Sequence, residues 1–120
     1  KWRDQFKNVK VIRLAEMYLT RAEANLLVGT TVGATPLEDV NLIRARVGLP
    51  SIPVSLNAIK DERRKELAGE GHRFFDLVRW GDAASVLASR GFKANKNEVF
   101  PIPLNSINQS SGILTQNPGY

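Results

Sequence analysis

The sequence predicts an all-α fold, with a helical hairpin at its start, short helices in its middle and an irregular C-terminal tail. Apolar residues recur at spacings of three and four over residues 11–28 and again over residues 36–47, which is the period of a helix with one packed face. Each stretch ends at a glycine, Gly29 or Gly48, as helices commonly do. Residues 99–120 contain three prolines and no charged residue, which predicts a tail without a regular ladder of hydrogen bonds.

The first predicted helix covers residues 11–28 and has an unusually wide apolar arc. An arc of this width indicates packing on more than one side, with a narrow polar strip opposite. The arc consists of Val11, Leu14, Ala15, Tyr18, Leu19, Ala22 and Leu26, and the polar strip of Arg13, Glu16, Thr20 and Glu23.

The second predicted helix begins at a capping box. Thr35 can accept from the backbone N–H of Glu38, Glu38 can reach back, and Pro36 suits the first helical position. The predicted buried face consists of Leu37, Val40, Ile43 and Val47. With the first helix this forms an antiparallel hairpin, about residues 11–48, of the tetratricopeptide-like kind. Because such repeats normally occur in arrays, we expect the chain to be a fragment with further sequence upstream.

The central stretch, about residues 56–80, predicts two charged helices. Ser55 or Asn57 can cap the first of them. Two closely spaced glycines make an unbroken helix costly, so we expect a turn over Gly69–His72 and a second helix from Arg73 to Trp80. Their apolar stripe consists of Leu67, Phe74, Leu77 and Val78. A short helix over about residues 83–90 and a wrapping tail over residues 99–120 complete the chain.

The charges of the central stretch lie three residues apart with alternating sign. On a helix, Arg63 faces Glu66, and the same spacing of three joins the successive residues of the series Glu70, Arg73, Asp76 and Arg79. We therefore predict a structural ion-pair ladder, whose members are Arg63, Glu66, Glu70, Arg73, Asp76 and Arg79.

Composition limits the possible functions. The net charge of +5 would permit a nucleic-acid partner, but most basic residues of the central stretch lie near an acid, so we expect none. The chain has no cysteine, which excludes disulfides, thiol catalysis and cysteine-bound metals. No apolar run approaches the ~20 residues of a membrane-spanning helix.

Two carboxylates and one histidine are the candidates for catalysis. Glu66 and Glu70 lie four residues apart, and glycoside hydrolysis requires one carboxyl group with a raised pKa beside an ionised one. The neighbouring Arg63 and Arg73 favour the ionised form of both. His72 has no second histidine for a metal and no nucleophile motif. We predict no catalytic residue, no metal site and no cofactor.

The two tryptophans are the candidates for stacking on a sugar ring. Trp80 follows a predicted helix, where an aromatic residue usually closes a core, and the core is the favoured interpretation. For Trp2, the sequence does not decide between a core residue and a sugar-stacking one. This residue lies in the basic stretch Lys1–Lys10, which we interpret as the end of a preceding loop or strand.

Four segments in order resemble the SusD/RagB family. Residues 13–24 are similar to its first signature helix and residues 40–50 to its next helix. Residues 62–81, which contain the run EGHRFFDLVRWG, are the most specific match. Residues 100–103 followed by residues 116–120 resemble its C-terminal closure. Together the four segments extend over almost the whole chain.

The resemblance implies the C-terminal part of a larger all-helical, lipid-anchored protein on the outer face of the outer membrane. Such proteins capture oligosaccharides or peptides and cover a SusC-like TonB-dependent transporter, and they are not enzymes. The lipidated cysteine and signal peptide of the family are not in this chain. Glycan-binding residues remain unknown, because those of the family vary and lie largely outside the matching segments. This chain would then serve mainly as scaffold.

Two alternatives remain open at the level of sequence. One is a free-standing helical-hairpin adaptor that binds other proteins, which upstream hairpin repeats without a signal peptide would distinguish. The other, less favoured, is a glycosidase that uses Glu66 and Glu70, which loss of hydrolysis in Glu66→Gln would support.

Overall fold

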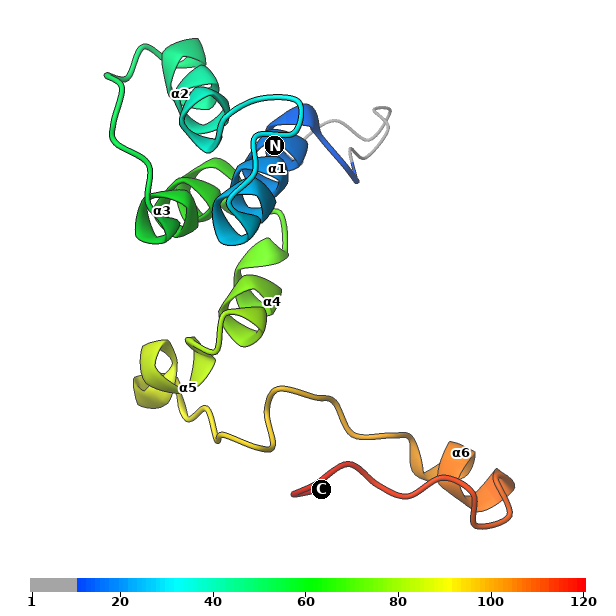
Figure 1. Ribbon diagram of the computed structural model, residues 1–120. Coiled ribbons are helices and arrows are strands. Elements are labelled where there is room, and N and C mark those ends of the chain that lie inside the picture. Colours follow the sequence, from blue (N-terminus) through cyan, green and yellow to red (C-terminus); the bar gives the residue numbers. More distant parts are fainter. Residues whose placement is uncertain (1–10) are drawn as a thin grey trace, which may run out of the picture. The chain divides into compact units, whose positions relative to one another are not determined.

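The computed structural model describes residues 11–120 and is helical (Figure 1). No strand occurs within this described part, so the all-α prediction is confirmed. The chain forms two compact units, one up to Glu70 and one from Gly71 to Tyr120. The predictions for Lys1–Lys10, Trp2 included, lie outside the described residues. Within residues 11–120, no helix combines the length and the apolar character needed to cross a membrane.

Three helices build the first unit: α1 (Leu14–Val28), α2 (Pro36–Arg46) and α3 (Leu56–Glu66). α1 packs against both α2 and α3 and is therefore the central helix of the unit. The buried core residues come from all three helices and are Leu19, Ala22, Val40, Ile43 and Ile59.

α1 begins three residues later than predicted, which corrects the N-terminal end of the expected apolar arc. Arg13 is extended (φ −137°, ψ 153°) and forms the N-cap, so Val11 precedes the helix and is exposed. Leu14 is also 64% exposed. Conversely, Glu23 of the predicted polar strip is buried. The rest of the predicted arc is confirmed, because Leu19 and Ala22 are buried in the core and Ala15, Tyr18 and Leu26 pack against it.

α2 begins as predicted, but its buried face is different. The capping box of Thr35 and Glu38 is present, with Pro36 in the first turn. Val40 and Ile43 are buried, whereas Leu37 and Val47 are exposed. Because α1 covers only one side of α2 within this unit, the outer apolar residues remain uncovered.

The helix break predicted between α3 and α4 is present. Ser55 caps α3 by accepting from the Ala58 N–H at 3.1 Å, which resolves the choice between Ser55 and Asn57. α3 ends at Glu66, and Gly71 has φ 84° as the N-cap of α4. A left-handed residue cannot continue a helix, so α3 and α4 are separate helices.

The second unit contains α4 (His72–Arg79), α5 (Ala83–Val86), a single 3₁₀ turn η1 (Ala88–Arg90) and α6 (Leu104–Gln109). Leu77 and Ala83 are its buried apolar residues. The ring of Phe74 lies 5.8, 6.4 and 6.3 Å from the rings of Phe75, Phe92 and Phe100. Phe74 is therefore the centre of an aromatic cluster that connects α4 to Phe92 and Phe100.

The tail is more ordered than its composition predicts, because residues 104–109 form α6. Side chains near the end of the chain also bind the backbone of residues 99–102. The Gln116 amide accepts from Ile102 N–H (2.8 Å) and donates to Ile102 C=O (2.9 Å). Asn117 donates to Phe100 C=O and the Tyr120 hydroxyl to Val99 C=O. These side chains supply the partners that the prolines and irregular backbone lack.

Candidate functional site

The N-terminal end of α1 is joined to the C-terminal end of α3 by one arginine. Arg13 donates from Nε to Glu70 Oε2 (2.7 Å), from Nη1 to Glu66 Oε1 (2.5 Å) and from Nη2 to the Glu66 carbonyl (2.5 Å). The carbonyl is one of those that a helix C-terminus leaves without an intrahelical partner, and a cation there also complements the helix dipole. The bond to Glu70, with a further contribution from Glu66, raises the pKa of Arg13.

Two arginines of α2 complete this polar cluster. Arg46 donates to the same Glu66 oxygen at 2.7 Å, so Glu66 lies between two guanidinium groups. Arg44 binds Glu62 at 2.9 Å and the Pro50 carbonyl at 2.9 Å. α1, α2 and α3 are therefore tied together by charge-assisted hydrogen bonds, which are stronger than neutral ones.

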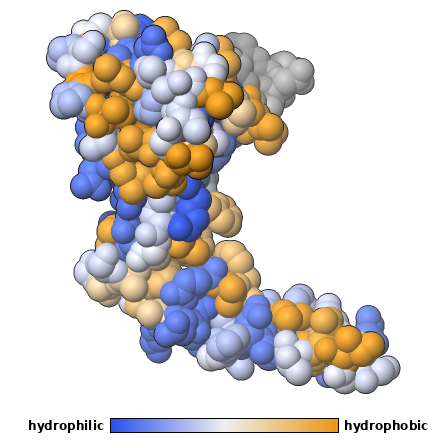
Figure 2. Space-filling view, in the orientation of Figure 1, coloured by the Kyte–Doolittle hydropathy of each residue, from blue (hydrophilic) through white to orange (hydrophobic). Residues whose placement is uncertain are grey.

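An apolar groove of about 410 Å³ lies beside this cluster, between α1 and α2. Five of its seven lining residues are aliphatic or aromatic: Leu14, Ala15, Tyr18, Leu42 and Ile43. The other two are Arg13 and Arg46, whose guanidinium groups bind Glu66. The groove therefore offers mainly an apolar wall with a charge-balanced rim. Figure 2 shows that hydrophobic residues gather over this helical unit.

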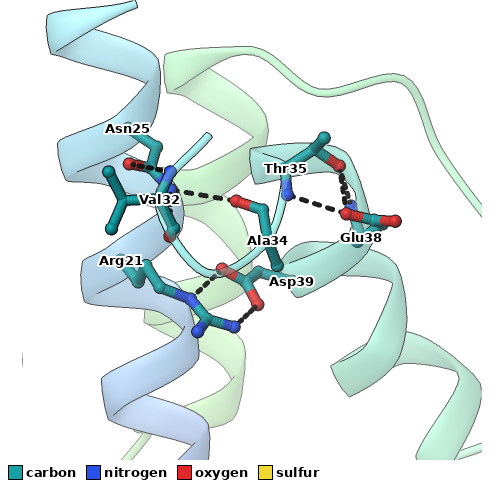
Figure 3. Close-up of polar contacts among 7 residues, drawn as sticks. All are labelled: Arg21, Asn25, Val32, Ala34, Thr35, Glu38 and Asp39. Atoms are coloured by element: carbon teal, nitrogen blue, oxygen red, sulfur yellow. Dashed lines mark hydrogen bonds and ion pairs between the residues drawn. The ribbon is translucent and has the colours of Figure 1, made fainter. Parts of the chain in front are cut away.

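The turn between α1 and α2 is held by polar side chains (Figure 3). The amide of Asn25 donates to the carbonyls of Val32 and Ala34, both at 3.0 Å, and its oxygen accepts from the Thr30 hydroxyl at 2.8 Å. Asn25 is itself buried, and its side-chain amide takes these hydrogen-bond partners from the turn. The conformation of the turn is thus stabilised by a side chain of the preceding helix, α1.

A bidentate ion pair lies beside the turn. Arg21 donates to both carboxylate oxygens of Asp39 at 2.9 and 2.7 Å, and this bond raises the pKa of Arg21 (Figure 3). Asp39 is almost completely buried. Its pairing with Arg21 explains how α2 tolerates an acid on its inner face. Gly33 has φ 78°, a left-handed conformation that strains other residues, and a Cβ there would lie 2.6 Å from Arg21 Nη1 and displace the end of that side chain.

The six residues of the predicted ladder lie in different surroundings. Arg63 is buried and donates to the Thr20 hydroxyl at 3.2 Å. Glu66 and Glu70 both bind Arg13, a partner that the spacing of the central stretch does not reveal. Asp76 accepts from Arg79 at 2.9 Å, and Arg73 is half-buried in α4. One signal in the sequence did point to Arg13: a cation at a helix N-terminus opposes the dipole and therefore needs another partner.

Trp80 is half-buried rather than a core residue. The Arg79 guanidinium lies over its ring, 4.6 Å from the centroid, and the same guanidinium binds the buried Asp76. Arg79 thus links the last turn of α4 to the aromatic side chain that follows it.

The two carboxylates considered for catalysis, Glu66 and Glu70, are both engaged in ion pairs. Glu66 and Glu70 share one arginine, Arg13, and Glu66 also binds Arg46. Within residues 11–120 no group of three potential metal ligands comes together.

Comparison with known proteins identifies the family. The model of the SusD family matches residues 3–98. The chain belongs to the SusD family. A solved laminarin-binding SusD-like protein is 58% identical, with a TM-score of 0.83 over 95% of this chain and 23% of that one.

Two further relatives come from Bacteroides thetaiotaomicron. Surface glycan-binding protein A, solved in complex with laminarihexaose, is 35% identical, with a TM-score of 0.77 over 92% of this chain and 25% of its own. The starch-binding protein SusD is 32% identical over 94% of this chain and 22% of its own length. The chain thus spans about a quarter of the length of these relatives.

Proposed function

We propose that the protein containing this chain binds a glycan of the laminarin type at the cell surface. The observation that carries this proposal is the 58% identity to a laminarin-binding SusD-like protein, far above the 32% shared with the starch-binding relative. A second relative, at 35% identity, was solved with laminarihexaose bound. The ligands of these two relatives, laminarin and laminarihexaose, thus agree.

Within that protein, the chain acts mainly as scaffold. Its conspicuous polar groups are occupied with one another: Arg13 with Glu66 and Glu70, Arg21 with Asp39, and Asn25 with the turn. A sugar pocket needs converging polar groups beside an aromatic surface. The described groove supplies an apolar wall instead, so we place the glycan contacts in the remaining three quarters of the protein.

The decisive experiment is a calorimetric titration of the full-length protein with laminarihexaose, with a starch-derived hexasaccharide as control. We expect binding of the laminarin oligosaccharide and at least ~10-fold weaker binding of the control, a difference of ~1.4 kcal/mol. The isolated 120-residue chain should bind neither with a Kd below ~1 mM. Equal or absent binding of both sugars by the full-length protein would contradict the proposed ligand.

Family membership also supports a partner and a location. We propose that the full-length protein is a lipoprotein on the outer face of the outer membrane and works with a SusC-like TonB-dependent transporter. Co-purification of the full-length protein with a β-barrel transporter from detergent-solubilised outer membranes is the expected result. Recovery without such a partner under conditions that preserve other outer-membrane complexes would contradict the partnership.

We further propose that the charged central residues are structural and that the protein is not an enzyme. The two carboxylates considered for a hydrolytic pair, Glu66 and Glu70, are both engaged in ion pairs with Arg13. Incubation of the full-length protein with laminarihexaose should therefore release no reducing ends. Hydrolysis that disappears in Glu66→Gln but persists in the control Asp61→Asn would show the opposite.

A further inference from the structure

The two motifs of the tail, residues 100–103 and residues 116–120, bind each other through hydrogen bonds from side chains to backbone. After α6 the chain runs back, so that residues 116–120 lie beside residues 99–102 (Figure 1). We call residues 116–120 the clasp. The proposed function makes no use of either motif, and their contacts point to a conformational role.

Contacts within the clasp hold its hydrogen-bonding groups in place. The Tyr120 N–H donates to the Asn117 carbonyl at 3.3 Å and closes a turn, in which Gly119 has φ 85°. A proline followed by a glycine with positive φ is typical of a type II turn. The Gln116 side chain accepts from the Asn117 N–H at 2.9 Å, and the Lys96 ammonium lies 4.5 Å from the centroid of the Tyr120 ring. The two amides and the phenol are thus arranged together.

The clasp binds backbone groups on both sides of one prolyl peptide bond. The Asn117 amide donates at 2.6 Å to the Phe100 carbonyl, which is the oxygen of the Phe100–Pro101 bond. The Gln116 amide accepts from the Ile102 N–H at 2.8 Å and donates to the Ile102 carbonyl at 2.9 Å. Two adjacent side chains therefore hold the residues before and after Pro101. The bond between them is trans, like the other peptide bonds of residues 11–120.

The burial of nearby side chains does not account for a single isomer of this bond. Phe100 is 69% exposed, and Pro101 is exposed as well. The Phe100 ring lies 6.3 Å from the Phe74 ring, but this contact is made before the bond and does not depend on the direction of the chain after it. Among the described residues, the hydrogen bonds of the clasp are the contacts that hold both sides.

The cis form of the bond would present different groups to the clasp. In that form the two Cα atoms lie ~2.9 Å apart instead of ~3.8 Å, and the chain leaves the proline in another direction. If Asn117 holds the Phe100 carbonyl, the Ile102 N–H then no longer lies where the neighbouring Gln116 side chain reaches it. We propose that the clasp selects the trans isomer of the Phe100–Pro101 bond and thereby gives residues 99–102 a single conformation. This inference does not depend on the glycan or on a transporter.

Fluorine NMR of the full-length protein tests the inference, with 4-fluorophenylalanine introduced at position 100. The isomers of a prolyl bond interconvert over tens to hundreds of seconds, so the preceding ring gives a separate signal for each. We expect one signal in the protein with an intact clasp. The double variant Gln116→Ala/Asn117→Ala should show a second signal of about 10–30% of the intensity, as in unfolded peptides. Addition of Pro101→Ala should remove it, because a bond before alanine stays trans.

The matched control is Asn108→Ala/Gln109→Ala, which removes the same two amides from exposed positions on α6. This control should keep a single signal. A milder variant, Gln116→Glu, retains the acceptor for the Ile102 N–H and loses the donor to the Ile102 carbonyl. Its second signal should be smaller than that of the double variant, and it serves as the test if the double variant does not fold.

Four outcomes would overturn the inference. A single signal in both clasp variants would show that other parts of the protein hold the bond trans. A second signal that persists after Pro101→Ala would show a rearrangement unrelated to the isomer. Two signals in the protein with an intact clasp would show that the clasp does not discriminate. The same second signal in the control would assign the effect to the loss of any two amides from the tail.

Discussion

Replacement of Arg13 by alanine should weaken the first helical unit more than any other exchange of a single partly exposed cation in it. The substitution removes three hydrogen bonds, two to carboxylates and one to the C-terminal turn of α3. Hydrogen bonds to charged groups contribute ~1.5–3 kcal/mol each, but not additively. The Arg13 side chain is 24% exposed, and Glu66 retains Arg46. We therefore expect a loss of ~2–3 kcal/mol in the free energy of unfolding, below the ~3–5 kcal/mol of a fully buried pair.

The assay is equilibrium denaturation of the full-length protein, monitored by a probe in this unit. Arg13→Lys should lose ~1–2 kcal/mol, because an ammonium cannot reproduce the planar three-way geometry. Lys65→Ala is the matched control: Lys65 also pairs with a carboxylate, Asp61, but both side chains are more than half exposed, so ~0.5 kcal/mol or less is expected. An Arg13→Ala loss no larger than that of Lys65→Ala would refute the reasoning.

Three further predictions concern the α1–α2 turn and the tail. The backbone N–H and hydroxyl of Thr35 lower the pKa of Glu38 below its usual 4.5, so its stabilisation is present above pH 4.5 and is lost as the pH falls through the lowered pKa. The difference in unfolding free energy between the native protein and Glu38→Gln should therefore disappear in acid; a difference independent of pH would contradict the assignment. Asn25→Ala should cost ~1–3 kcal/mol in denaturant melts, because the carbonyls of Val32 and Ala34 lose the donor that the buried Asn25 supplies, and a neutral result would show that water replaces the amide. Gln116→Ala should speed hydrogen exchange of the Ile102 amide by ~10-fold or more, whereas an unchanged rate would show that another group protects it.

Features determined by nearby residues could be predicted from the sequence. The capping box of Thr35 and Glu38 and the helix break before Gly71 both depend on residues at most a few positions apart. The family could also be predicted, because its motifs are local runs such as residues 62–81.

Features that depend on distant partners could not be predicted. Arg13 and Glu66 are separated by 53 positions, and a spacing rule of three or four residues cannot connect them. Leu37 and Val47 carry the correct helical period for a buried face, yet they are exposed because burial also requires a neighbouring element. The period identifies the face that is apolar, and only the three-dimensional packing decides whether it is covered.

The side chains that bind the backbone of the tail have a consequence for self-association. Between Pro101 and Pro103, Ile102 has the only backbone N–H, since proline has none, and the Gln116 amide occupies both its N–H and its C=O. The carbonyls of Val99 and Phe100 accept from Tyr120 and Asn117. An extended apolar segment with unpaired backbone groups is a template for intermolecular strands and for aggregation. In this uncharged tail, the usual protection by lysine is replaced by amide and phenol groups that occupy the hydrogen-bonding positions which a second strand would need.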